Sequence, residues 1–172
     1  MASNSFIQYS SSSSSHAIRI TYDVFVSFRG EDTRNNFTAF LFHALRENGI
    51  HAFKDDADLK KGEFIAPELL QAIEGSRLFV VVFSKNYASS TWCLRELAHI
   101  YNCTDQASRS RVLPIFYDVD PAEVRKQSDY YGIAFAEHEK RFREDKEKME
   151  ELQRWREALT QVANLSGWDI RN

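Results

Sequence analysis

The chain has 172 residues, of which 43% are hydrophobic and 27% charged, as in an ordinary single globular domain. Its formal net charge of −3 argues against nucleic acid as a partner, because a phosphate backbone calls for clustered positive charge. The two cysteines, Cys93 and Cys103, cannot build a disulfide framework and indicate a reducing compartment, the cytoplasm or also the nucleus. The longest apolar run, residues 78–83, is too short to span a bilayer, so no membrane association is expected.

Residues 1–17 are expected to form a disordered, serine-rich tail. Residues 10–15 are an unbroken serine run, which offers no apolar surface to bury and cannot offset the entropy lost on ordering. The folded domain is therefore predicted over residues 18–170.

Short apolar runs alternate with segments of helical spacing through the rest of the chain. The runs predict strands at residues 23–28, 50–53, 78–83 and 112–116. The intervening segments predict helices at residues 33–48, 65–74 and 91–102. This alternation predicts an α/β domain with a mainly parallel sheet.

The last third of the chain is harder to interpret. The charged segment 137–151 has mixed signs and is predicted to be the solvated face of a helix, which then docks through an apolar stripe beginning at Leu152. A fifth strand comes from residues 168–170 or from a short segment after Tyr131. Pro114 removes a hydrogen-bond donor from its strand, which places that strand at or near a sheet edge.

A candidate site follows from this architecture. Ligands of open parallel sheets bind beyond the carboxyl ends of the strands, where the strand order reverses. For the order 2-1-3-4-5 the reversal lies between the first and third strands, so residues 27–34 and 84–91 meet there with the helix that carries Glu96. The loop with Lys60 and Lys61 can fold over the same crevice. The cationic side chains around this crevice suit a pyrophosphate, and the Glu96 carboxylate suits ribose hydroxyls.

Each of these residues has a plainer interpretation. Glu96 could be a first-turn carboxylate that complements the helix dipole. Trp92 could belong to the core, Arg29 and Arg34 to surface ion pairs, and Lys60 to a solvated loop. The five histidines show no metal-ligand spacing, so no metal is expected.

Four segments resemble the plant TIR domains, which are N-terminal signalling modules of intracellular immune receptors with a nucleotide-binding domain and leucine-rich repeats. Residues 22–34 (YDVFVSFRGEDTR) resemble their opening motif, Lys61 and Gly62 their second-strand loop, residues 89–97 (SSTWCLREL) the motif around their catalytic glutamate, and residues 113–121 (LPIFYDVDP) their fourth-strand motif. The resemblance covers residues 22–168. It implies a flavodoxin-like fold with a central parallel five-stranded sheet of order 2-1-3-4-5 flanked by helices, and a chain that is a fragment of such a receptor.

The resemblance also implies an activity, the cleavage of NAD+ or NADP+ into nicotinamide and linear or cyclic ADP-ribose products. NAD+ is then a consumed substrate, and no cofactor is expected. Glu96 is the implied catalytic residue. The predicted substrate-binding residues are Arg29, Gly30, Glu31, Arg34, Lys60, Lys61, Gly62 and Trp92. Nicotinamide leaves as a neutral molecule, so one carboxylate that stabilises an oxocarbenium-like transition state suffices without a second acid.

The alternative function is a non-catalytic adaptor that signals by homotypic self-association alone. Plant members often carry a Ser-His pair in their first helix, where this chain has Ala39 and Phe40. A second assembly surface of the family keeps a single glycine here, Gly132. These three residues are the predicted self-association contacts, and weak, concentration-dependent association is expected.

Overall fold

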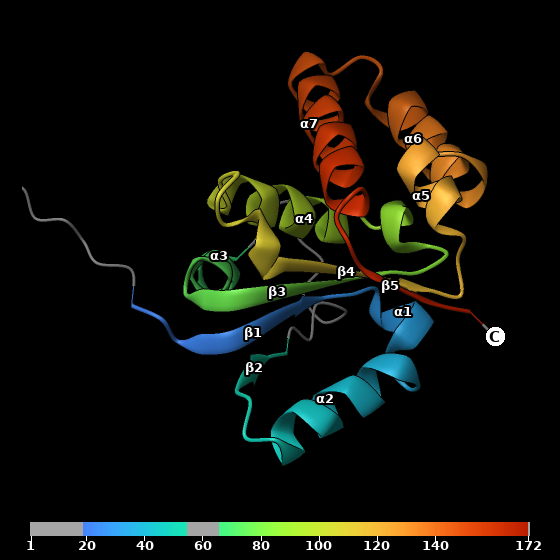
Figure 1. Cartoon of the computed structure of the whole chain (residues 1–172). Helices are drawn as coiled ribbons and strands as arrows, with labels where there is room; N and C mark the ends of the chain where they lie inside the picture. Colours follow the sequence, from blue (N-terminus) through green and yellow to red (C-terminus); the bar gives the residue numbers. More distant parts are fainter. Residues whose placement is uncertain (1–18, 55–65, 172) are drawn as a thin grey trace, which may run out of the picture.

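The computed structural model describes residues 19–54 and 66–171 (Figure 1). The predicted tail and the loop residues Lys60, Lys61 and Gly62 lie outside these ranges. A five-stranded sheet forms the centre, with the order β2-β1-β3-β4-β5 and parallel pairing throughout. The predicted strand order is therefore confirmed. The strands are β1 (Tyr22–Ser27), β2 (Ala52–Phe53), β3 (Ser76–Phe83), β4 (Val112–Tyr117) and β5 (Trp168–Ile170).

Helices cover both faces of the sheet. The helices are α1 (Gly30–Thr33), α2 (Phe37–Glu47), α3 (Pro67–Glu74), α4 (Thr91–Cys103), α5 (Pro121–Lys126), α6 (Asp129–Phe142) and α7 (Lys146–Ala163). In Figure 1, α2 lies below the sheet, and α3, α4 and α7 lie above it. Successive strand residues point to opposite faces. Val24 and Val26 of β1 accordingly pack toward α2, whereas Phe25 joins the larger core beneath α3, α4 and α7.

One predicted helix starts later than expected and another is divided. The expected helix 33–48 is α2, which begins at Phe37, where the side chain of Asn36 caps it by accepting a hydrogen bond from the Phe37 amide at 2.5 Å. The charged segment 137–151 spans the end of α6 and the start of α7, where Asp145 caps α7 by accepting from the Lys148 amide at 3.1 Å. A continuous helix was wrong for this segment, because a capping side chain can start a new helix within a pattern that stays polar.

Pro114 lies one strand in from the edge, in β4, opposite Val81 of β3. The ladder to the edge strand β5 begins one residue later, at Ile115. Gly167, the residue before β5, approaches β4 so closely that a Cβ there would lie 2.1 Å from the Pro114 carbonyl oxygen. The fifth strand is thus the 168–170 alternative, and a glycine before it is required by this contact.

Candidate active site

One pocket lies at the carboxyl end of β1, where the strand order reverses. Its walls are the end of β1, helix α1 and the first half of α4. The residues that line it are Val26, Phe28, Arg29, Gly30, Glu31, Arg34, Ser90, Trp92, Cys93 and Glu96. Every predicted catalytic or substrate-binding residue within the described part of the chain is therefore in one place.

Glu96 lies in the second turn of its helix. Helix α4 begins at Thr91, and its cap Ser90 accepts a hydrogen bond from the Cys93 amide at 3.2 Å. Because Glu96 is five residues beyond the first helical residue, it lies outside the turn where a carboxylate complements the dipole, and no acidic residue occupies that turn. Only 2% of Glu96 is exposed. The plainer interpretation of Glu96 as a dipole partner therefore does not fit its position.

The floor of the pocket is rigidly bonded between β1 and α4. The Cys93 thiol donates to the Phe28 carbonyl across 3.6 Å. The Tyr87 hydroxyl lies 2.8 Å from the Ser27 hydroxyl and donates to the Cys93 carbonyl at 3.2 Å. Burial, and after it the negative charge of Glu96, raises the pKa of Cys93, so this thiol stays protonated and is not a nucleophile.

The rim of the pocket carries an ion pair. Arg29 Nη2 lies 2.7 Å from Glu31 Oε2, and the two side chains are 21% and 71% exposed. Glu31, a predicted substrate-binding residue, thus places a second carboxylate in the pocket lining with Glu96. It faces solvent and is paired with a guanidinium, so its environment differs from that of the buried Glu96.

Asp32 is a residue of this site that the sequence reasoning missed. Its carboxylate accepts hydrogen bonds from the Ser84 hydroxyl at 2.6 Å, the Asn86 amide nitrogen at 2.9 Å and the Asn86 side chain at 3.2 Å. Its Oδ1 also lies 3.7 Å from Arg29 Nε. Asp32 therefore fastens α1 to the segment after β3 and holds the guanidinium at the rim. An acidic residue in the loop after the first strand was the available signal.

The pocket is narrow in this state, with a volume of about 60 Å³. A buried water needs on the order of 10–15 Å³ of such volume, so only a few water molecules fit. Ligand pockets are typically about 300–1,000 Å³. A ligand of nucleoside size therefore fits in the pocket only if the rim moves.

The predicted self-association residues lie on two separate surfaces. Phe40, in α2, is 75% exposed, and Ala39 beside it is also exposed. Gly132 lies in α6, on the other side of the sheet, next to Ile133, which is 63% exposed. The structure thus separates these contacts into one surface on α2 and one on α6.

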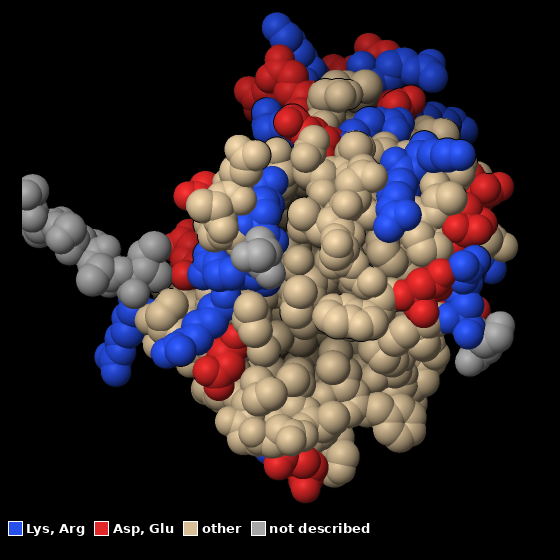
Figure 2. Space-filling model, in the orientation of Figure 1, with Lys and Arg blue, Asp and Glu red and all other residues tan. Residues whose placement is uncertain are grey.

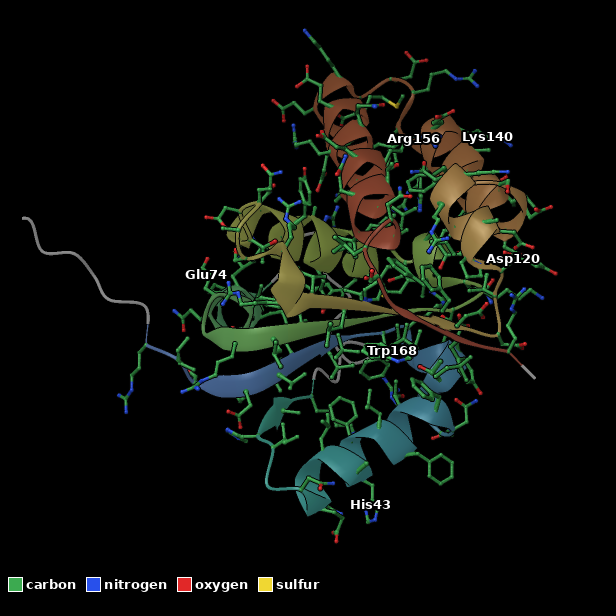
Figure 3. All side chains as sticks on the ribbon, in the orientation of Figure 1. His43, Glu74, Asp120, Lys140, Arg156 and Trp168 are labelled. Atoms are coloured by element: carbon green, nitrogen blue, oxygen red, sulfur yellow. The ribbon has the colours of Figure 1, made fainter. Side chains whose placement is uncertain are left out.

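A broad uncharged area occupies the middle of the face in Figure 2, and most Lys, Arg, Asp and Glu side chains lie around its border. In the same orientation Trp168 of β5 lies in the middle of the molecule (Figure 3), and it is 57% exposed. In the described part of the chain, every helix is too short or too polar to cross a membrane.

A parallel sheet of order 2-1-3-4-5 with its pocket at the strand-order reversal defines a flavodoxin-like α/β domain. The chain belongs to the TIR family, since residues 21–172 match the family model for the TIR domain. It is similar to the disease resistance protein RPV1 of Vitis rotundifolia, at 54% identity over 99% of this chain and 12% of that protein. It is also similar to the TMV resistance protein N of Nicotiana glutinosa, at 50% identity over 90% of this chain and 13% of that protein. The chain therefore spans about an eighth of the length of these curated relatives.

Among solved structures, the chain is similar to the TIR domains of an activated Roq1 resistosome that recognises the pathogen effector XopQ. The TM-score is 0.77 and the identity 54%, over 88% of this chain and 89% of that one. The likeness at this identity agrees with the parallel sheet and flanking helices described above.

Proposed function

We propose that this chain is the NAD+ nucleosidase signalling domain of a plant intracellular disease-resistance receptor, which self-association activates to trigger defence and cell death in the cytoplasm or nucleus. The observation that carries this proposal is Glu96, a buried carboxylate at the floor of a pocket whose wall includes Arg29, Arg34 and Trp92. The substrate is NAD+ or NADP+.

The chemistry suits this set of groups. Nicotinamide departs as a neutral molecule, so its leaving nitrogen needs no proton. The ribose carbon develops positive charge, which an adjacent carboxylate stabilises most strongly in a site with little water. Trp92 and Glu96 share one side of α4, since they are four residues apart, so the indole can stack on a planar ring while the carboxylate faces the sugar. Arg29 and Arg34 supply the positive charge that a pyrophosphate requires.

The narrowness of the pocket supports an activity that depends on assembly. At about 60 Å³ the pocket excludes a nicotinamide riboside, and the ion pair between Arg29 and Glu31 lies at its rim. Contacts between neighbouring copies that favour an opened rim would raise the population of the active form. Nicotinamide release per chain should therefore rise with protein concentration.

The two surfaces on α2 and α6 support self-association through unlike patches. When different patches of one molecule meet, copies join head to tail, and the assembly grows until it closes. The TIR domains to which this chain is similar are part of an activated resistosome, which supports such assembly. A solely adaptor function would use these surfaces and leave Glu96 without a part in signalling.

Glu96→Gln separates the two functions. This variant keeps the shape of the side chain and removes its charge. Nicotinamide release from NAD+, followed by chromatography at high protein concentration, should fall at least about 10²–10³-fold. The control is Glu68→Gln on an exposed turn of α3, which should leave the rate unchanged. Equal rates for Glu96→Gln and the wild type would refute the enzymatic proposal and leave the adaptor.

Sedimentation tests the assembly independently. Phe40→Ser and Ile133→Ser each remove the exposed apolar side chain of one patch, and because every head-to-tail contact needs both patches, each single variant should be monomeric, as should the double variant. The wild type should form larger species as its concentration rises. A wild type that stays strictly monomeric at high concentration would contradict the proposal of two unlike patches.

A further inference from the structure

Three side chains with metal-binding atoms meet between α3 and α4, away from the pocket residues. One carboxylate oxygen of Glu74, one ring nitrogen of His99 and the Cys103 sulfur lie within 4.8 Å of one another. His99 Nε2 and Glu74 Oε1 are already 3.2 Å apart. Glu74 is the last residue of α3, and Figure 3 labels it beside that helix.

The two α4 residues share a helix face because they are four positions apart. Neither is deeply buried: His99 and Cys103 are half-buried and Glu74 is exposed. The group can therefore be reached from solvent, and the exposed Glu74 side chain can adjust most freely, whereas Cys103 packs against the core.

We propose that Glu74, His99 and Cys103 form a zinc-binding site that joins α3 to α4. Zinc is commonly held by cysteine sulfur, histidine nitrogen and carboxylate oxygen in a tetrahedral arrangement, at about 2.3, 2.0–2.1 and 2.0–2.2 Å respectively. A thiolate and a carboxylate together balance the two positive charges of the ion. Three protein ligands leave the fourth position to water.

The geometry requires a small movement only. At those bond lengths, neighbouring ligand atoms of a tetrahedral site are roughly 3.3–3.8 Å apart. The His99–Glu74 distance of 3.2 Å is close to this already. All separations are within 4.8 Å, so each has to shorten by about 1 Å at most, which rotation of the Glu74, His99 and Cys103 side chains can supply. The proton of the thiol is released to solvent when sulfur binds the metal.

The other cysteine of the chain does not compete with Cys103 for the metal. This cysteine, Cys93, is 3% exposed and bonded to the Phe28 carbonyl. Along α4, positions 92, 96, 99 and 103 recur at helical spacing and lie on one side of the helix. The proposed zinc site therefore lies near the carboxyl-terminal end of α4, on the same side of the helix that lines the pocket near its amino-terminal end. A bound ion would hold α3 against the carboxyl-terminal end of α4.

The test uses the intact chain with its thiols reduced. Calorimetric titration with zinc chloride should show one ion per chain. Cobalt(II) in place of zinc should give the near-ultraviolet charge-transfer band of a cobalt–thiolate bond. Cys103→Ser should abolish this band, and His99→Gln should weaken zinc binding at least about tenfold. His43→Gln is the matched control, because His43 is exposed on α2, across the sheet from Glu74 (Figure 3).

Circular dichroism of each variant establishes that it is folded before its metal binding is compared. Glu74→Gln offers a further folded variant, since it changes only an exposed side chain. The proposal is overturned if folded Cys103→Ser binds zinc as the wild type does, or if the reduced wild type takes up no zinc at equimolar concentration. Neither result bears on nicotinamide release, so the zinc site and the enzymatic proposal can fail separately.

Discussion

Asp32→Ala should destabilise the domain far more than an average surface substitution. The Asp32 side chain is 14% exposed, and its carboxylate accepts from the Ser84 hydroxyl and from both the backbone and the side chain of Asn86. Alanine removes the acceptor and leaves these donors in a partly buried place. The Ser84 residue itself is 2% exposed, so water cannot readily replace the lost partner.

The expected loss follows from the two donors least accessible to water, the Ser84 hydroxyl and the Asn86 backbone N–H. A buried donor left without a partner costs about 1–3 kcal/mol, so their combined cost is about 3 kcal/mol when the loop relaxes partly. For a domain of this size each kcal/mol lowers Tm by about 2–4 °C, so the melting temperature should fall by about 6–12 °C. Asp32→Asn keeps one acceptor oxygen, and its loss should be intermediate.

Thermal unfolding followed by circular dichroism measures this effect, and Asp105→Ala is its matched control. Asp105 also accepts from a serine hydroxyl, at 2.7 Å, and from a backbone amide, at 2.8 Å, but it is exposed. The Tm of Asp105→Ala should hardly differ from that of the wild type, because water replaces the lost acceptor. Equal shifts for Asp32→Ala and Asp105→Ala would show that burial of the donors is not what makes the Asp32 contacts matter.

Four further substitutions test other parts of the fold. Burial lowers the pKa of His138 below its ordinary value of 6.5. As the pH falls through about 6.5, the unfolded chain therefore takes up a proton at His138 before the folded chain does. Stability should fall as the pH drops from about 7.5 to 5.5. His138→Gln should flatten that slope in Tm. In denaturant titrations, Gly167→Ala should lower the free energy of unfolding by about 3 kcal/mol or more, because its Cβ would lie 2.1 Å from the Pro114 carbonyl oxygen. Gly49→Ala meets open space but has a φ of +70°, so it should lower the free energy of unfolding by only about 1–2 kcal/mol. Tyr87→Phe should cost about 1–2 kcal/mol in the same titrations, since it leaves a buried serine hydroxyl at the end of β1 without its partner.

The strands of the sheet could be predicted from the sequence alone, because local apolar runs mark them. Residues 79–83 and 112–116 are covered on both faces and read as nearly continuous hydrophobic sequence. The pocket residues were also accessible to sequence reasoning. Residues 29–34 come just after β1, and residues 90–96 come a few residues after β3, which pairs with β1, so the topology alone brings them together.

The features that were missed depend on contacts between distant residues. Asp32 bonds to residues 52 and 54 positions away, and no local pattern fixes that register. The near-closure of the pocket depends on how α1 packs, which composition and spacing do not determine. The proposed zinc ligands were not among the sequence candidates because the histidines were compared with one another only. The i,i+4 pair of His99 and Cys103 was a visible signal, whereas Glu74 comes from the preceding helix.

The two walls of the pocket differ in how freely they can move, and this difference decides how a substrate would enter. Helix α4 buries Leu94, Leu97 and Ile100 in the main core, so displacing it would expose much apolar surface. Helix α1 has four residues, of which only Thr33 is buried, and Asp32 fastens it to the segment after β3. The rim on α1 is therefore the wall that can open with less apolar exposure than α4, at the cost of the Asp32 contacts, and Glu96, held on the fixed wall, keeps its position while the pocket enlarges.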